Sequence, residues 1–184
     1  FFTKRTIGIE LIIFHLMEII GAMSCGWALD RQSNQAEGAP KITSPLHNNR
    51  RRKAIECLVL FIIINATGNI LAFCQEQDAL LHGVNAFDIS ELKALKPSLA
   101  FACWGFADAQ IQVYCYWLLG HLYDDGGDHS RAVGFYKCIQ SLGFSVGFYA
   151  IPTSRVNALT QLEISSFVFV SGTVLSLFQL PPHD

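Results

Sequence analysis

The sequence is poor in charged residues. Only 15% of its 184 residues are Asp, Glu, Lys or Arg, whereas 51% are hydrophobic and 12% are aromatic. A soluble domain carries about 25% charged residues, so this deficit indicates contact with lipid rather than a large surface facing water. The formal net charge of -2 and the lack of any run that interleaves basic and aromatic residues give no reason to expect a nucleic-acid partner.

Several chemical motifs are also missing. The six cysteines form no Cys-x-x-Cys pair, and no histidine stands beside them at zinc-ligand spacing. All six lie in apolar stretches, where we interpret them as reduced, small side chains. The polar segments contain no nucleophile and base pair, metal-ligand set or glycine-rich phosphate loop, so the sequence does not support an enzyme, a metal or a cofactor.

The amino-terminal end lacks the features of a signal peptide. The chain begins with Phe1, and no short basic region with a cleavage site follows it. We therefore expect the chain to begin partway through a longer protein. On this interpretation the preceding part of the protein is one expected partner, and the lipid bilayer is another.

Five apolar stretches are long enough, or nearly so, to cross a membrane. The hydrocarbon layer is about 30 Å thick and needs about 20 apolar residues in a helix. The sequence therefore predicts an all-α, multi-pass integral membrane protein that forms a single membrane domain over residues 1–184. The predicted spans are 7–29, 54–74, 97–122, 132–151 and 164–180.

The loop between the first two predicted spans sets the orientation. Residues 30–53 are rich in Asn, Gln, Ser and Pro and end in Arg50, Arg51, Arg52 and Lys53. A dense basic cluster directly beside a span is typical of the cytosolic side. We therefore place the loop 30–53 in the cytosol and the loop 75–96 on the extracytosolic side.

Four acidic residues fall inside the predicted spans. At about 1.5 Å per residue, Glu18 and Asp108 both lie about 16 Å from a span end, close to the middle of the membrane. An ionisable group there costs roughly 2.5 to 3.5 kcal/mol, so each needs a partner or a water-filled cavity. Glu10 and Glu56 lie near the two membrane surfaces, where we expect solvent or interfacial groups to pair with them.

Two pairs of polar residues share a helix face. His15 and Glu18 are three residues apart, and they form either a protonatable pair along a path or a buried pair that fixes helix packing. Asp108 and Gln112 are four residues apart, and Asp108 is the leading candidate for a functional residue. Gln110 points to another side of the same helix, which indicates a helix inside a bundle.

The fourth predicted span contains a lysine among apolar residues. Lys137 lies about 8 Å from the cytosolic end, where it either extends to the headgroups or turns inward to neutralise one of the midplane carboxylates. Gln140 is one turn further in and should face the protein. Gly143 and Gly147 form a small-xxx-small pair, which permits another helix to approach closely.

Several segments resemble a known family. They are Tyr116-Trp117-Leu118-Leu119-Gly120, the run from Gly134 to Gly143, and a small-residue helix end that leads to Asp30 and then to the arginines at 50–52. These segments resemble the uncoordinated-ninety-three-like branch of the major facilitator superfamily, especially its fungal members. The resemblance implies that the five spans are the last five transmembrane helices, which form most of the carboxyl-terminal half of the fold. The missing amino-terminal half of the same protein is then an expected partner, and another membrane protein is a further candidate partner. The resemblance also implies that Asp30 and the arginines clasp neighbouring helices on the cytosolic side.

The resemblance implies three alternative functions. The first is part of a secondary transporter that works by alternating access. The second is a non-transporting membrane protein that regulates a channel or escorts receptors, and the third is an inactive truncated product. For a transporter, the residues expected to line a substrate or proton path are Asp108, Gln112, Glu18, His15, Lys137 and Gln140.

Overall fold

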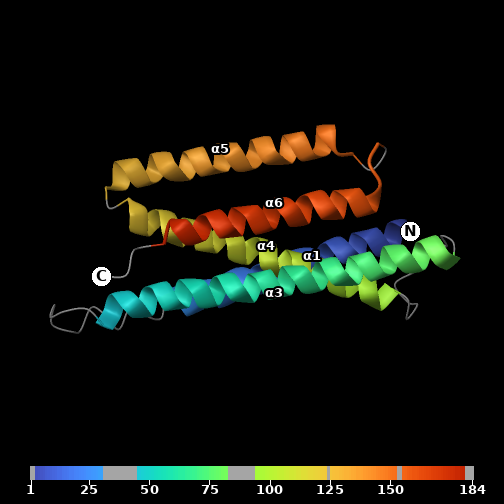
Figure 1. Cartoon of the computed structure of the whole chain (residues 1–184), viewed down its shortest axis with the longest axis horizontal. Helices are drawn as coiled ribbons and strands as arrows, with labels where there is room; N and C mark the ends of the chain where they lie inside the picture. The colour runs from blue at the N-terminus through green and yellow to red at the C-terminus, as the bar shows by residue number, and fades with distance from the viewer. Residues whose placement is uncertain (1–2, 31–44, 83–93, 124, 153–154, 181–184) are drawn as a thin grey trace.

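The computed structural model describes residues 3–30, 45–82, 94–123, 125–152 and 155–180. All regular structure in these ranges is helical, which confirms the predicted all-α class. Figure 1 shows long helices that run along a common direction. They are α1 (Lys4–Asp30), α3 (Pro45–His82), α4 (Leu95–Leu122), α5 (Gly126–Ala150) and α6 (Ala158–Phe178).

The helices extend beyond the apolar stretches from which they were predicted. Helix α3 has 38 residues, and its first turns include the basic cluster that the sequence analysis placed in a loop. A helix needs no apolar side chains once it leaves the membrane, so a count of apolar residues marks a span and not the helix ends. Helix α5 begins at Gly126, because the side chain of Asp125 caps it by accepting a hydrogen bond from the backbone N–H of Gly127.

Helices α1, α3 and α4 form the centre of the bundle, and the closest approach is between α1 and α4. A β-carbon added at Gly21 of α1 would overlap the backbone carbonyl of Phe106 in α4. In the same way, a β-carbon added at Gly105 of α4 would overlap the backbone carbonyl of Phe14 in α1. The two glycines therefore let the backbones touch in both directions.

A small apolar core lies on one side of this crossing. It joins α1, α3 and α4 near the ends that were predicted to be cytosolic. The rings of Phe61 and Tyr114 pack edge to face there, with centroids 5.6 Å apart. Leu180, just after α6, closes this core. Its buried members are Cys25, Leu29, Ala54, Cys57, Leu58, Phe61, Ala107, Tyr114 and Leu180.

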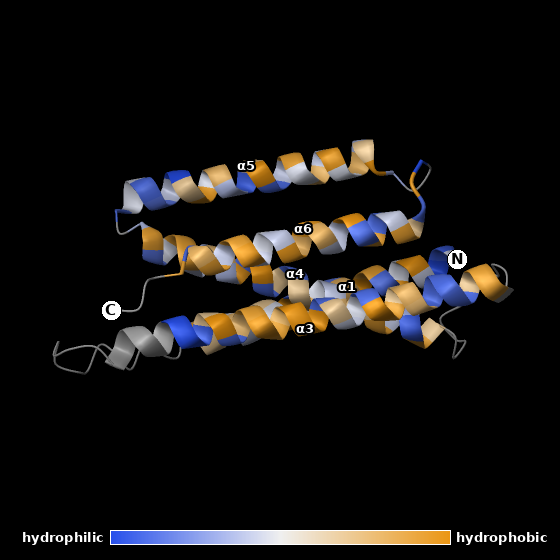
Figure 2. Ribbon diagram, in the orientation of Figure 1, coloured by the Kyte–Doolittle hydropathy of each residue, from blue (hydrophilic) through white to orange (hydrophobic). Residues whose placement is uncertain are grey.

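Helices α5 and α6 lie at the edge of the bundle. Helix α5 has no buried residue, and its Phe148 and Tyr149 are 82% and 81% exposed. Figure 2 shows apolar residues along α3, α5 and α6, and many of their large apolar side chains are exposed. Exposed apolar side chains in such number indicate contact with lipid or with other membrane helices.

Three of the described helices, α1, α3 and α6, are long and apolar enough to cross a membrane. Helices α4 and α5 have sufficient length, with 28 and 25 residues, but they are less apolar. These two helices carry Asp108, Gln112, Lys137 and Gln140, which lowers their hydropathy. Five spans therefore stay a prediction, with three supported by length and composition.

Candidate functional site

Polar side chains from α1, α4 and α5 meet to form a continuous chain. Gln112 Nε2 donates a hydrogen bond of 2.8 Å to Asp108 Oδ2. Lys137 Nζ, from α5, donates to Gln112 Oε1 at 3.2 Å. The polar groups continue into α1, because the carboxyl group of Glu18 lies close to that of Asp108.

One further polar residue joins this set at each end. On α1, His15 Nδ1 lies 2.6 Å from Glu18 Oε2. On α5, Lys137 Nζ also donates to Gln140 Oε1 at 2.8 Å. The structure thus brings together all six residues that were predicted to line a path, and we call them the polar chain: His15, Glu18, Asp108, Gln112, Lys137 and Gln140.

Lys137 turns toward α4, where its ammonium group bonds to amide oxygens, so the predicted neutralisation of a midplane carboxylate stays a prediction. Its ammonium group lies 5.3 Å from the centroid of the Tyr116 ring and 5.7 Å from that of Tyr136. These distances are within the range of cation–π attraction. The two rings pack edge to face with centroids 5.6 Å apart, so the aromatic pair holds the lysine beside Gln112.

The polar chain has more acid than base. Glu18 and Asp108 contribute two carboxyl groups, and Lys137 contributes one ammonium group. His15 adds a positive charge only when it is protonated. With a neutral histidine, the site therefore needs one more proton or one more cation to balance its charge.

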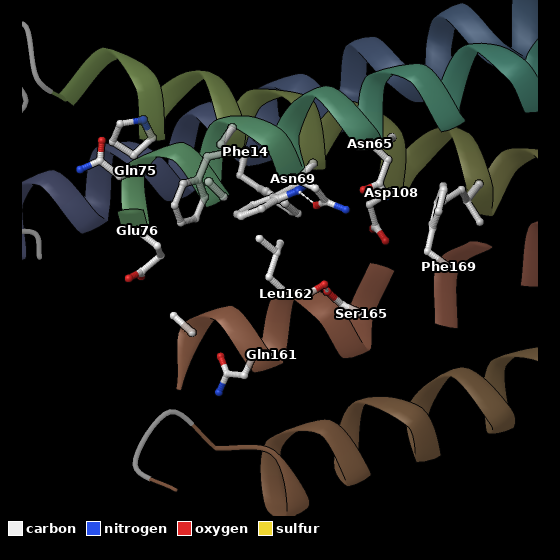
Figure 3. A pocket seen from close by; sticks show the side chains of 18 residues that line it. Phe14, Asn65, Asn69, Gln75, Glu76, Asp108, Gln161, Leu162, Ser165 and Phe169 are labelled. Atoms are coloured by element: carbon white, nitrogen blue, oxygen red, sulfur yellow. Dashed lines mark hydrogen bonds between the residues drawn. The ribbon is translucent and has the colours of Figure 1, made fainter. Parts of the chain in front are cut away.

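A pocket of about 640 Å³ lies between α3, α4 and α6. Figure 3 shows Asn65 and Asn69 of α3 on one wall, with Gln161, Leu162 and Ser165 of α6 opposite them. Asp108 lines one end of the pocket near Asn65, so it belongs both to the pocket and to the polar chain. The volume falls in the range of small-molecule sites, which is about 300 to 1,000 Å³.

Asn69 holds the pocket walls together. Its Oδ1 accepts a hydrogen bond of 2.8 Å from Trp104 Nε1 on α4, and its Nδ2 donates one of 2.9 Å to Ser166 Oγ on α6. A single amide thus links three helices. Because the indole N–H is a donor only, its bond fixes Oδ1 of the amide toward Trp104.

This pocket was not predicted from the sequence. The available signal was the pair Asn65 and Asn69, two amides four residues apart within an apolar stretch. Residues with that spacing share one helix face, and polar side chains in a span rarely face lipid. The contribution of α6 could not be anticipated, because serines in helices commonly bond to their own backbone, as Ser166 also does to Leu162 at 2.7 Å.

The two acids near the span ends, Glu56 and Glu10, differ in exposure and in their partners. Glu56 pairs with Arg52 and Lys53 at 2.9 and 2.8 Å, as expected for an interfacial group. Glu10 was expected at the surface but is only 1% exposed, and it accepts a hydrogen bond from Ser98 of α4. The reason is that α1 and α4 stay in contact as far as this level, so the side of α1 on which Glu10 lies is covered.

Some predicted roles are not tested by these contacts. Gly143 and Gly147 have nothing within 4 Å of an added β-carbon, so their role in packing stays a prediction. The side chains of Asp30 and Arg50 lie outside the described residues. The predicted clasp of Asp30 by the arginines at 50–52 therefore also stays a prediction.

The chain was compared with known proteins. It is 28% identical over 179 residues to UNC93-like protein 1 and, equally, to UNC93-like protein 2, both from Arabidopsis thaliana. The aligned region covers 96% of this chain. The chain is a relative of the UNC93-like proteins. This finding confirms the resemblance to the uncoordinated-ninety-three-like group, whereas the fungal-type assignment stays a prediction.

The similarity to the UNC93-like proteins is limited in extent. The chain spans 36% of the length of each of these two relatives. No family model matches the chain, and no solved structure matches it either. Together with the apolar helices, the relationship to UNC93-like proteins establishes a membrane-embedded protein.

Proposed function

We propose that this chain is part of a secondary transporter that works by alternating access, with the polar chain as the site that couples ion and cargo movement. The observation that carries the proposal is the connected set of polar groups from three helices. Ionisable groups inside a membrane are costly and are usually functional. In secondary transporters, such groups gather near the membrane midplane, where helices from different repeats meet.

The geometry of Asp108 supports a coupling role. Its carboxyl group interacts with Glu18, receives a hydrogen bond from Gln112 and lines the pocket. The pocket and the polar chain therefore share one carboxyl group. Loading the pocket with a cation would change the charge that the rest of the polar chain experiences, and this is the physical basis of coupling between two sites.

The Asp108→Asn variant tests this proposal, because it keeps the shape of the side chain and removes its charge. We expect proton flux through the longest natural form of the protein, reconstituted in vesicles and driven by a membrane potential, to fall at least tenfold. A pH-sensitive dye inside the vesicles measures the flux. Glu163→Gln is the matched control, since Glu163 lies exposed on α6 outside the pocket, and equal flux in Asp108→Asn and wild-type protein would remove Asp108 from the mechanism.

A second candidate function is that of a membrane protein that binds another membrane protein. The observation that favours it is the open surface of α5, which has no buried residue. Both Gly143 and Gly147 on this helix leave space for a close neighbour. Small residues at this spacing let a second helix approach, because van der Waals packing drives helix association in lipid.

A photo-crosslinking residue at Phe144 tests this second function. If α5 binds a partner through its glycines, one crosslinked species should form in membranes, and Gly147→Leu should reduce its yield at least fivefold. Gly8→Leu is a suitable control, because Gly8 on α1 also has nothing within 4 Å. Crosslinking to lipid alone, or a yield that does not change in Gly147→Leu, would count against a partner at this surface.

A further inference from the structure

We infer that the pocket between α3, α4 and α6 binds an organic cation that carries aromatic or other apolar groups. The inference deepens the proposed function, since it names the class of cargo and rests on the chain being part of a transporter. It is drawn from the charge of the pocket lining, the aromatic rings around it and the unbalanced acid of the polar chain.

The charge of the lining has one sign. Among the described residues that line the pocket, the ionisable side chains are the two acids Glu76 and Asp108, and none is Lys, Arg or His. Figure 3 shows these two acids toward opposite ends of the pocket. A charged ligand that enters must therefore be a cation, because an anion would meet two carboxylates and no positive side chain.

The carboxyl group of Asp108 is not neutralised by a direct ion pair. In the part of the chain that the structure describes, no basic side chain forms an ion pair with it. Lys137, the nearest base in the polar chain, directs its ammonium group to the amide oxygens of Gln112 and Gln140. Asp108 thus keeps its capacity to pair with a cation from the pocket side.

The rings favour an organic cation over a bare metal ion. Four aromatic side chains line the pocket, and the rings of Phe101 and Trp104 pack edge to face with centroids 5.7 Å apart. Aromatic faces attract organic cations and also bury their apolar groups. A metal ion would need several oxygen ligands converging on one point, whereas the oxygens here are distributed along the pocket. The four aromatic residues are Phe14, Phe101, Trp104 and Phe169.

The uncharged polar side chains of the pocket lining determine which hydrogen bonds a ligand could form there. Asn65, Gln161 and Ser165 line the pocket as neutral groups that can donate or accept. They suit an amine with N–H groups as well as a quaternary cation, which needs no acceptor. The volume of about 640 Å³ is sufficient for a molecule of drug size.

A pair of probes of equal shape and opposite charge tests the inference. Tetraphenylphosphonium is an aromatic cation, and tetraphenylborate is an anion of the same shape. We expect the purified chain, in nanodiscs of uncharged lipid, to bind labelled tetraphenylphosphonium saturably and at least tenfold more tightly than tetraphenylborate. Equal affinity for the two ions, or uptake of the cation without saturation, would overturn the inference.

Variants of the pocket locate the binding site. Glu76→Gln removes one carboxylate without altering any hydrogen bond described above, and we expect it to weaken cation binding about threefold to tenfold, with Glu163→Gln unchanged. Trp104→Leu should weaken binding about fivefold or more, with the exposed Trp27→Leu as its control. Cation binding that is unaffected by both Glu76→Gln and Asp108→Asn would place the cation elsewhere and refute the site.

The result of the cation-binding experiment can be distinguished from the result of the proton-flux experiment. Binding in nanodiscs is measured without any gradient, so it does not depend on proton flux. If the cation fails to bind while proton flux still requires Asp108, the cargo class is wrong and the proposed function stands. If the cation binds but flux is independent of Asp108, the pocket is a binding site and the coupling mechanism fails.

Discussion

Replacing Gly105 with alanine should separate α1 from α4 and lower the stability of the whole bundle. The added methyl group would overlap the backbone carbonyl of Phe14, and a backbone atom cannot rotate away as a side chain can. Overpacking of this kind costs about 1–3 kcal/mol. We expect the midpoint of thermal unfolding in detergent to fall by several degrees in Gly105→Ala, and by a similar amount in Gly21→Ala, which meets the carbonyl of Phe106.

Gly143→Ala is the matched control for these two variants. Gly143 also lies within a helix, but an added β-carbon has nothing within 4 Å. Alanine is favoured over glycine inside a helix by about 0.5–1 kcal/mol, so this variant should keep or raise the unfolding midpoint. If Gly105→Ala and Gly143→Ala shifted the midpoint equally, the close backbone contact between α1 and α4 would not exist.

Removing the charge of Lys137 should impair transport more than any other single change on α5. The Lys137→Met variant keeps a long side chain but leaves Glu18 and Asp108 without the one ammonium group of the polar chain. Gln112 and Gln140 would also lose the donor that joins them. We expect potential-driven proton flux to fall at least tenfold, whereas Arg131→Met on the same helix should behave as wild type, because Arg131 pairs with Asp128 on an exposed surface.

A second substitution distinguishes loss of charge balance from loss of packing. If the imbalance of charge causes the defect, Lys137→Met combined with Glu18→Gln should recover a substantial part of the flux, since one acid and one base are then both removed. Loss of a packing contact would instead make the double variant no better than the single one. A flux in Lys137→Met that equals the wild-type value would exclude Lys137 from the path.

The residues of the polar chain could be found from the sequence because each is a polar or ionisable residue within an apolar stretch. A carboxylate, a lysine or an amide inside an apolar stretch is costly wherever the helices lie. Helical spacing also shows which residues of one helix share a face, as with Asp108 and Gln112. The sequence therefore identified the six members, and the structure showed that they connect.

The contacts between helices could not be found in this way. Periodicity gives the faces of a helix but not the neighbour that covers each face. Gly21 and Gly105 are ordinary glycines in the sequence, and only the crossing of α1 and α4 shows why no larger residue fits. The burial of Glu10 and the link from Asn69 to α6 depend on the same information, since each partner lies more than 80 residues away along the chain.

The length of the apolar part of α3 can be compared with the thickness of the membrane. Glu56 and Glu76 are the ionisable residues that bound its apolar centre, and their positions are 20 residues apart, which corresponds to about 30 Å along a helix. This distance is close to the hydrocarbon thickness of about 30 Å. Asn65 lies about 14 Å from Glu56 on the same scale, so the pocket, which Asn65 and Glu76 both line, reaches from the middle of this apolar stretch to its end at Glu76.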